Sequence, residues 1–408
     1  MIIIHNFPAS YGDTFIIEIQ DATFDAVNIL VDCGKGFKSG AQKYLEKMGL
    51  DRAHKIDRFI ITHFDDDHIA GAYNFLKENG DPLNPSIIEI KQIWLNTFRH
   101  LQFKKRKPGQ LSATETNKLN LFKSAFPSVS ESQEESEIGA AQALLAGQII
   151  FEKGYDWNTD FGGQACIAPT KITIAENVTL HLLTPSVEKL EAIETFFINK
   201  LNDDFGLNPT QEDIFDDAFE LFLKSNERLK MEEIEISAGT SEISVERIDQ
   251  LVKTAEYTPD LSPGNGSSIS FIIETSHRKL LFLADAHAED VIQALEKIFT
   301  ECKRPIHFDA IKIAHHGSFR NNKPELFKLI DSDKFIFSTN GKHPKHIHPD
   351  VETIAHIVSR PLPSCFSVRT LYFNHSFVEK QVHLAALEKK ELQDKFNYKI
   401  SMEREISI

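Results

Sequence analysis

The stretch Thr62-His63-Phe64-Asp65-Asp66-Asp67-His68 follows directly on the apolar run Phe59-Ile60-Ile61, which is typical of a buried strand. It contains four potential metal ligands within six residues, His63, Asp65, Asp67 and His68. Because side chains alternate in direction at a strand end, the first two can converge on one cation while the last two, on the following turn, reach a second. Neighbouring aspartates repel one another unless cations neutralise them. The stretch therefore predicts a two-metal site rather than the alternative, a solvated acidic turn.

Matching segments lie on both sides of this stretch. Two predicted strands precede it, Gly12–Glu18 and Val27–Gly34, and the second ends in an Asp-x-Gly turn. Four segments follow it, in which polar residues stand beside apolar runs: Asn265-Gly266-Ser267-Ser268-Ile269, Leu280–Asp285, Ile311–Ser318 and His346–Val351. Each segment alone is common in proteins, but their order along the chain is characteristic of one type of fold.

In this order the segments resemble the metallo-β-lactamase fold. The usual family pattern is His-x-His-x-Asp-His, and Asp65 stands where the second histidine normally stands. That departure is similar to the hydrolase domain of the competence DNA-uptake proteins of the ComEC type and their soluble relatives. The resemblance covers roughly residues 1–97 and 262–360. It implies an α/β fold, in the form of a four-layer αββα sandwich with metals at the sheet edge and a helical insertion.

The resemblance also implies roles for the polar residues. His63 and Asp65 would hold one metal, and Asp67 and His68 the other, with Asp285 bridging both. His315 would complete the second metal site, while its neighbour His316 contacts substrate or replaces His315 as the ligand. The residues expected to act in catalysis are Asp67, His316 and His348, with His346 as the alternative to His348.

Two divalent metal ions are the expected cofactors, with zinc first and manganese as the alternative. The carboxylate of Asp65 in place of an imidazole makes the site harder and shifts its preference from zinc toward manganese or magnesium. The family pattern adds a ligand histidine after a hairpin, and the corresponding residue here is His181. It stands inside an alternating strand rather than at its end, so we interpret it as a strand residue. One metal would then lack a ligand.

The domain organisation follows from changes in composition along the chain. Residues 1–97 and 263–408 are predicted to form the hydrolase domain, and residues 98–262 a mostly helical insertion that includes a core hairpin near 171–184. The insertion would cap the site as a lid or bind a protein partner. Its basic run Phe103–Pro108 is either an edge of a substrate groove or a solvated loop. Near the C-terminus, Lys380–Leu384 is a predicted strand, followed by a short helix and a tail.

The net charge of −15 over 408 residues argues against a general nucleic-acid-binding surface, although it does not exclude a nuclease. No apolar run is long enough to span a membrane, and four cysteines without CxxC spacing are typical of a cytoplasmic protein. The predicted activity is hydrolysis of a phosphodiester, in DNA, RNA or a nucleotide, by a metal-bridging hydroxide. The alternatives are hydrolysis of a carboxylic ester or lactone, and a metal-stabilised subunit of a bacterial defence system that binds a partner protein.

Overall fold

The computed structural model describes residues 1–10, 12–20, 25–50, 54–101, 114, 117, 146–205, 243–341, 347–364, 366–376 and 382–408. The chain has a mixed α/β fold built on two large sheets, and the predicted α/β class is confirmed. The six-stranded sheet has the order β18-β1-β2-β3-β5-β7. Its strands are β1 (Ile2–Asn6), β2 (Phe15–Ile19), β3 (Val27–Val31), β5 (Arg58–Ile60), β7 (Ile93–Trp94) and β18 (Glu405–Ser407).

The eight-stranded sheet has the order β17-β16-β15-β13-β11-β10-β9-β8. Its strands are β8 (Thr170–Ala175), β9 (Val178–Thr184), β10 (Ser270–Thr275), β11 (Lys279–Phe282), β13 (Ala310–Lys312), β15 (Lys334–Phe337), β16 (Arg369–Phe373) and β17 (Tyr398–Ser401). Two small two-stranded sheets pair β4 (Lys55–Ile56) with β6 (Glu89–Ile90), and β12 (Ile306–His307) with β14 (Ile330–Asp331).

Each large sheet is antiparallel on one side and parallel on the other. In the six-stranded sheet β1, β2 and β3 are antiparallel neighbours, while β3, β5 and β7 run parallel. In the other sheet β8 to β11 are antiparallel, and β11, β13, β15, β16 and β17 run parallel. Because parallel neighbours end at the same edge of a sheet, residues that follow β3 and β5, or β11 and β13, are brought together there.

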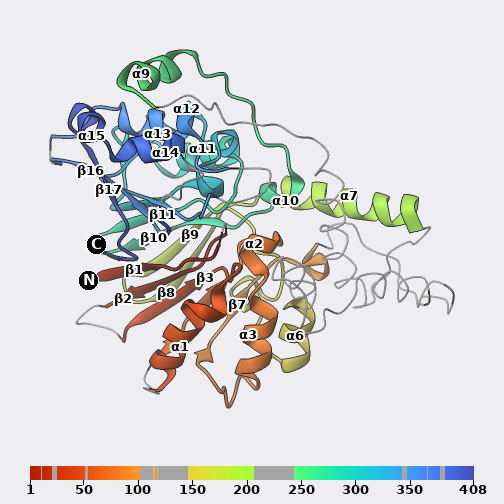
Figure 1. Cartoon of the computed structure of the whole chain (residues 1–408). Helices are drawn as coiled ribbons and strands as arrows, with labels where there is room; N and C mark the ends of the chain where they lie inside the picture. Colours follow the sequence, from red (N-terminus) through yellow and green to blue (C-terminus); the bar gives the residue numbers. More distant parts are fainter. Residues whose placement is uncertain are drawn as a thin grey trace.

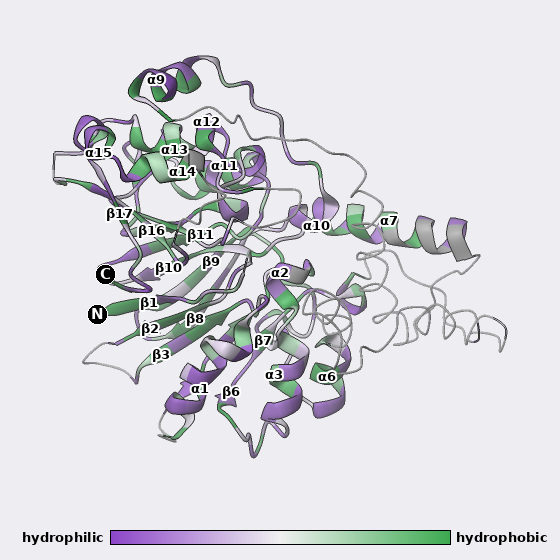
Figure 2. Ribbon diagram, viewed as in Figure 1, coloured by the Kyte–Doolittle hydropathy of each residue, from purple (hydrophilic) through white to green (hydrophobic). Residues whose placement is uncertain are grey.

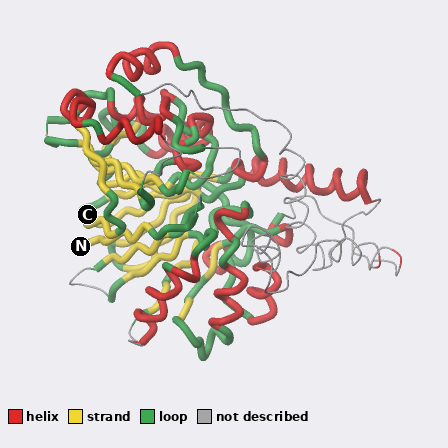
Figure 3. The backbone as a smooth tube through the Cα atoms, in the orientation of Figure 1, coloured by secondary structure: helices red, strands yellow, loops and turns green. Residues whose placement is uncertain are grey.

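Helices lie on both sides of the strands (Figure 1). Those in the N-terminal half are α1 (Ala41–Leu50), α2 (Asp66–Ile69), α3 (Ala72–Asn79), α6 (Ala146–Lys153) and α7 (Val187–Phe205). Those in the C-terminal half are α9 (Val245–Thr254), α10 (Pro263–Gly266), α11 (Ala288–Ile298), α12 (Pro324–Leu329), α13 (Val351–Val358), α14 (Val382–Ala385) and α15 (Lys390–Phe396). Figure 3 shows the strands as one central block, with α1, α3 and α6 on one side and α9, α11, α12 and α13 on the other.

Three apolar clusters hold the fold together. One lies between the sheets, where Phe15 of β2 meets Phe282 of β11 edge to face at 5.7 Å and Phe282 stacks on Phe271 of β10. A second joins the six-stranded sheet to α1, α3 and α6, and a third joins the eight-stranded sheet to α9, α11, α12 and α13. Strands buried on both faces are mostly apolar, with single polar residues such as Asn28 of β3 and Lys312 of β13, and Figure 2 shows green along parts of the central strands.

Part of the predicted insertion contributes directly to this framework. The hairpin of β8 and β9 forms one edge of the eight-stranded sheet, and Ile150 of α6 belongs to the same apolar cluster as Phe75 of α3. The basic run at 103–108 lies outside the described residues. Within the described part of the chain, no helix is long and apolar enough to cross a membrane.

The C-terminal tail departs from the sequence-based prediction. Val382–Ala385 is helical, so the predicted strand ending at Leu384 is wrong there. The tail instead supplies β17 to one large sheet and β18 to the other. Both strands are short and are formed by backbone pairing with a neighbour, which local sequence patterns do not reveal.

Candidate metal centre

Side chains from two parts of the chain meet beyond the carboxyl ends of the parallel strands. The segment after β5 contributes His63, Asp65, Asp67 and His68, and α2 begins within it. Asp285 follows β11, while His315 and His316 follow β13. Three of the residues at these strand ends have a left-handed backbone: Ala284 (φ 47°), His315 (φ 44°) and His316 (φ 54°). Such a conformation is costly outside glycine and is concentrated at functional sites.

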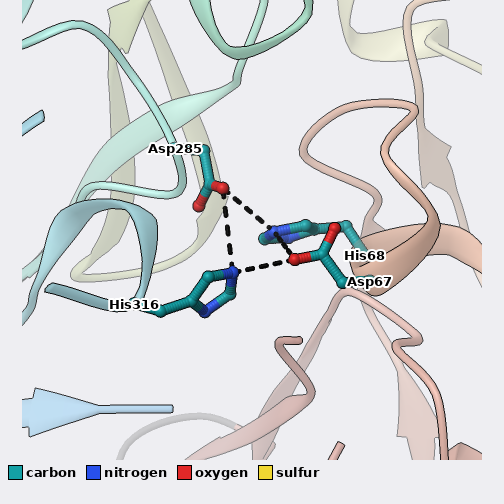
Figure 4. A group of neighbouring side chains, drawn as sticks. All are labelled: Asp67, His68, Asp285 and His316. Carbon is teal, nitrogen blue, oxygen red and sulfur yellow. Dashed lines mark hydrogen bonds and ion pairs between the residues drawn. The ribbon is translucent and has the colours of Figure 1, made fainter. Parts of the chain in front are cut away.

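The deep half of the centre consists of Asp67, His68, Asp285 and His316. One ligand atom from each lies within 4.8 Å of those of the other three, and Figure 4 shows the side chains pointing toward one another. His316 Nε2 is 2.8 Å from Asp67 Oδ2, and His68 Nε2 is 3.4 Å from Asp285 Oδ2. Thus His316, rather than His315, lies beside Asp67 and His68, where the sequence analysis expected His315 to complete the group.

The outer half surrounds the same carboxylate from the other side. His63 Nε2 is 3.5 Å from Asp65 Oδ2 and 4.0 Å from Asp285 Oδ2. His315 Nε2 is 3.6 Å from Asp285 Oδ2. The side chains of Asp65 and His315 are 21% and 27% exposed, whereas those of His68 and His316 are at most 4% exposed. Solvent therefore reaches the centre at Asp65 and His315, and to a smaller extent at Asp67, whose side chain is 17% exposed.

The donor atoms fit a bound cation. His63 Nε2, His68 Nε2 and Asp285 Oδ1 are buried and have no hydrogen-bond partner, whereas buried polar atoms in proteins are normally paired. Nitrogen and oxygen ligands at about 2.0–2.2 Å from a zinc ion lie ~3.3 Å apart in a tetrahedron. Four of the pair separations in the deep half are 2.8, 3.4, 3.6 and 3.8 Å, which lie on both sides of that value. The site can hold a divalent metal.

A second layer of hydrogen bonds orients the deep imidazoles. Asp32 Oδ2 lies 2.8 Å from His68 Nδ1, and Asp32 Oδ1 accepts the backbone N–H of Thr62 at 2.7 Å. His316 Nδ1 lies 2.8 Å from the carbonyl oxygen of Ser338. With both Nδ1 atoms so engaged, the Nε2 atoms of His68 and His316 face the centre, as in metal sites whose histidines donate to carboxylates or carbonyls.

Behind this layer lies a buried ion pair between Asp13 and Lys312. Their side chains are 2% and 1% exposed, and the ammonium contacts the carboxylate directly. Burial alone would raise the pKa of Asp13, but the charge of Lys312 and the nearby His316 lower it to about 2. Asp13, Asp32 and His68 also cluster like metal ligands. Lys312 already supplies positive charge there, so this second group needs no metal.

The charges of the metal-free centre shift the titration of its histidines. Burial alone would lower the pKa of His316, but the carboxylates of Asp285, Asp13 and Asp67 outweigh it and raise that pKa from 6.5 to about 10. The pKa of His68 is also raised, because Asp285, Asp67 and Asp32 outweigh burial. Without a cation, protons on these two imidazoles balance the carboxylates.

A pH dependence of the metal-free protein follows. Because the pKa of His316 is higher folded than unfolded, its contribution to stability is complete below pH 6.5 and is lost as the pH rises through about 10. We expect the free energy of unfolding in EDTA to fall across this window, by up to about 1.4 kcal/mol per pH unit for each such group. Urea denaturation at both ends of the window measures it. The His316→Gln variant should show a shallower fall, and an equally steep one would contradict the assignment.

Three other predicted histidines have different positions. His348 lies at the rim, with its ring centroid 5.3 Å from that of His315 and its Nδ1 3.3 Å from Asp350 Oδ1. His346 lies outside the described residues. His181, in β9, pairs with Glu274 of β10 at 2.8 Å, as expected of a strand residue, and is not part of the centre.

Sequence reasoning did not assign a role to Asp13, Asp32 or Lys312. Asp13 stands in a predicted strand, and Asp32 in the Asp-x-Gly turn that ends the next one. The signal available for Lys312 was a single charged residue inside the apolar run Ala310–Ala314, since a fully buried lysine normally requires a partner. No family model matches the chain, and no curated protein matches it.

Proposed function

We propose that this chain is a dinuclear metal-dependent hydrolase that cleaves phosphodiesters. One observation carries the proposal: Asp285 Oδ2 lies within 4.0 Å of the Nε2 atoms of four histidines, His63, His68, His315 and His316. A single carboxylate oxygen surrounded in this way, with further carboxylates on both sides, is the arrangement expected of a ligand shared by two cations.

The fold supports the same proposal. We assign the two face-to-face sheets and their outer helices to the αββα sandwich of the metallo-β-lactamase fold, in the form found in ComEC-type proteins. The centre lies beyond the strand ends, where the backbone is held rigidly by the sheets. This assignment explains why residues from two distant parts of the chain converge on Asp285.

The roles of the residues follow from their position. His63, Asp65 and Asp285 would hold one divalent cation, and Asp67, His68, His316 and Asp285 the other, with zinc as the first choice and manganese as the alternative. Bound cations of this kind activate water and stabilise the charge that develops on phosphoryl oxygens. We assign His348 at the rim to protonation of the leaving oxygen, with Asp350 orienting its ring. In the metal-free protein His316 Nε2 and Asp67 Oδ2 share a hydrogen bond at 2.8 Å, which cation binding would replace.

The substrate class is a nucleic acid or a nucleotide. Phosphodiesters would match a centre that held two cations, with Asp65 and His315 partly exposed beside them. The predicted insertion at 98–262 would limit substrate size as a lid, or dock a protein partner. Two alternatives remain for the experiment to distinguish. One is hydrolysis of a carboxylic ester or lactone, and the other is a role in binding a partner protein without hydrolysis.

We expect the protein, purified without added metal and then supplied with zinc or manganese, to hydrolyse bis-p-nitrophenyl phosphate and not a p-nitrophenyl ester. Elemental analysis should find about two cations per chain. Activity on single- and double-stranded nucleic acids then narrows the substrate class. Ester hydrolysis alone, or a metal content far below two with a co-purifying partner, would refute the proposal.

The His63→Ala variant provides the matching mutational test. It should lose metal and activity while the circular dichroism spectrum is unchanged, because the imidazole loses only the contact of Nδ1 with the adjacent Thr62 hydroxyl, and Nε2 has no hydrogen-bond partner. His181→Ala is the control, since that histidine pairs with Glu274 outside the centre. A His63→Ala variant as active as the parent protein would contradict the proposed mechanism.

A further inference from the structure

His315 is held in a strained and well-defined position. Its backbone is left-handed (φ 44°, ψ 57°), and its N–H donates to the carbonyl oxygen of Ala284 at 2.8 Å. One edge of the ring points to Asn321, whose Oδ1 lies 2.8 Å from Nδ1. The other edge faces the centre, where Nε2 lies 3.6 Å from Asp285 Oδ2. The position of the ring proton decides whether His315 presents a lone pair or an N–H group to the centre through Nε2.

The surroundings of Asn321 settle the orientation of its amide. Its Nδ2 lies 3.0 Å from Asp260 Oδ2, 3.0 Å from the carbonyl oxygen of Asp285 and 3.4 Å from that of Ala286. All three neighbours are hydrogen-bond acceptors. If the amide were turned over, Oδ1 would face three oxygens and both amide protons would lose their acceptors. The amide nitrogen therefore faces Asp260, and the amide oxygen faces His315.

This orientation determines the tautomer of His315. An amide oxygen only accepts, so Nδ1 of His315 must donate its proton, and the neutral ring then carries a lone pair on Nε2. Asn265 Nδ2 also approaches Nδ1, but at 3.4 Å, and it already donates to Asp260 Oδ2 at 2.6 Å. The Asp260 carboxylate, 4.0 Å from Nδ1, further favours a proton on that nitrogen. The shorter contact with Asn321 and the negative charge of Asp260 both favour a proton on His315 Nδ1.

The outer half of the centre needs such a lone pair. His63 and Asp65 are its other ligands beside the shared Asp285. The hairpin histidine of the family pattern corresponds to His181, which is engaged with Glu274 on β10. His315 is the described imidazole whose Nε2 faces Asp285 from the exposed side.

We propose that Asn321, anchored by Asp260, is a positioning residue that holds His315 as the Nδ1–H tautomer, so that His315 Nε2 serves as the ligand missing from the outer half of the centre. The assignment of a ligand role rests on the proposed function, whereas the tautomer does not. His315 thus belongs with His63 and Asp65, and His316 belongs with Asp67 and His68.

The first test is the tautomer of His315 in the metal-free wild-type protein. Long-range proton–nitrogen correlation spectra distinguish the two neutral tautomers, and the His315→Ala spectrum identifies the signal among the 17 histidines. We expect the Nδ1–H pattern for His315. A signal from the Nε2–H tautomer, or an even mixture, would overturn the proposal whatever the protein hydrolyses.

The second test uses two neighbouring asparagines of equal burial. Asn321→Ala should produce a mixture of tautomers at His315 and weaken the second, weaker phase of a zinc calorimetric titration by about 10- to 100-fold. Asn322→Ala should change neither, because the side-chain amide of Asn322 donates to the backbone oxygens of Ala314 and Ser318 and not to the ring of His315. An Asn321→Ala protein with unchanged zinc binding would refute the positioning role. If the spectra and the zinc phases change as expected but no phosphodiester is cleaved, only the proposed function fails.

Discussion

We expect the Asp285→Asn variant to lose cation binding in both halves of the centre and to lower kcat/KM for a phosphodiester by about a thousandfold or more. The two side chains have nearly the same shape, so the substitution removes charge rather than volume. Asp285 Oδ2 lies within 4.0 Å of the Nε2 atoms of both His63 and His316. A neutral amide there would leave each cation without its shared anionic ligand, which is why the expected effect exceeds that of any single histidine.

The measurement combines elemental analysis with steady-state kinetics on bis-p-nitrophenyl phosphate. Asp309→Asn is the matched control, since that carboxylate pairs with Arg278 and the backbone of Lys279, away from the centre. The control should bind metal and turn over like the parent. An Asp285→Asn protein that still carried two cations per chain would show that Asp285 is not shared between them.

The second large effect concerns stability rather than chemistry. Lys312→Met should lower the free energy of unfolding by about 3–5 kcal/mol, because it leaves the buried carboxylate of Asp13 without its partner. Asp13→Asn combined with Lys312→Met removes both charges and should recover a large part of that loss. Denaturation in EDTA keeps metal binding out of the comparison.

A neighbouring strand offers the control for this prediction. Lys334 of β15 pairs with Asp333 at 3.0 Å, and the two side chains are 24% and 21% exposed. Lys334→Met should cost no more than about 1 kcal/mol, since pairs open to solvent contribute little. If Lys312→Met lowered the free energy of unfolding as little as Lys334→Met, the pair of Asp13 and Lys312 would not contribute to stability as proposed.

These predictions separate what local sequence could and could not reveal about the centre. The cluster His63 to His68 was identified from its ligand types and from the strand before it, and the strand ending before Asp285 was identified in the same way. The sequence did not reveal which of His315 and His316 lies beside Asp67 and His68. Alternation along a strand assigns neighbouring side chains to opposite faces, but both histidines lie beyond β13 with a left-handed backbone, where that rule does not apply.

The sequence by itself determined the α/β class, the main strands and the residues that carry ligand chemistry, because these depend on hydrophobic periodicity and residue type over short distances. Tertiary structure alone decided which histidines surround Asp285, that Asn321 lies against His315, and that Lys312 lies against Asp13. It also decided that the tail pairs with β1 as β18. These contacts join residues far apart in the chain, and their geometry is determined by the packing of two sheets, which no local pattern encodes.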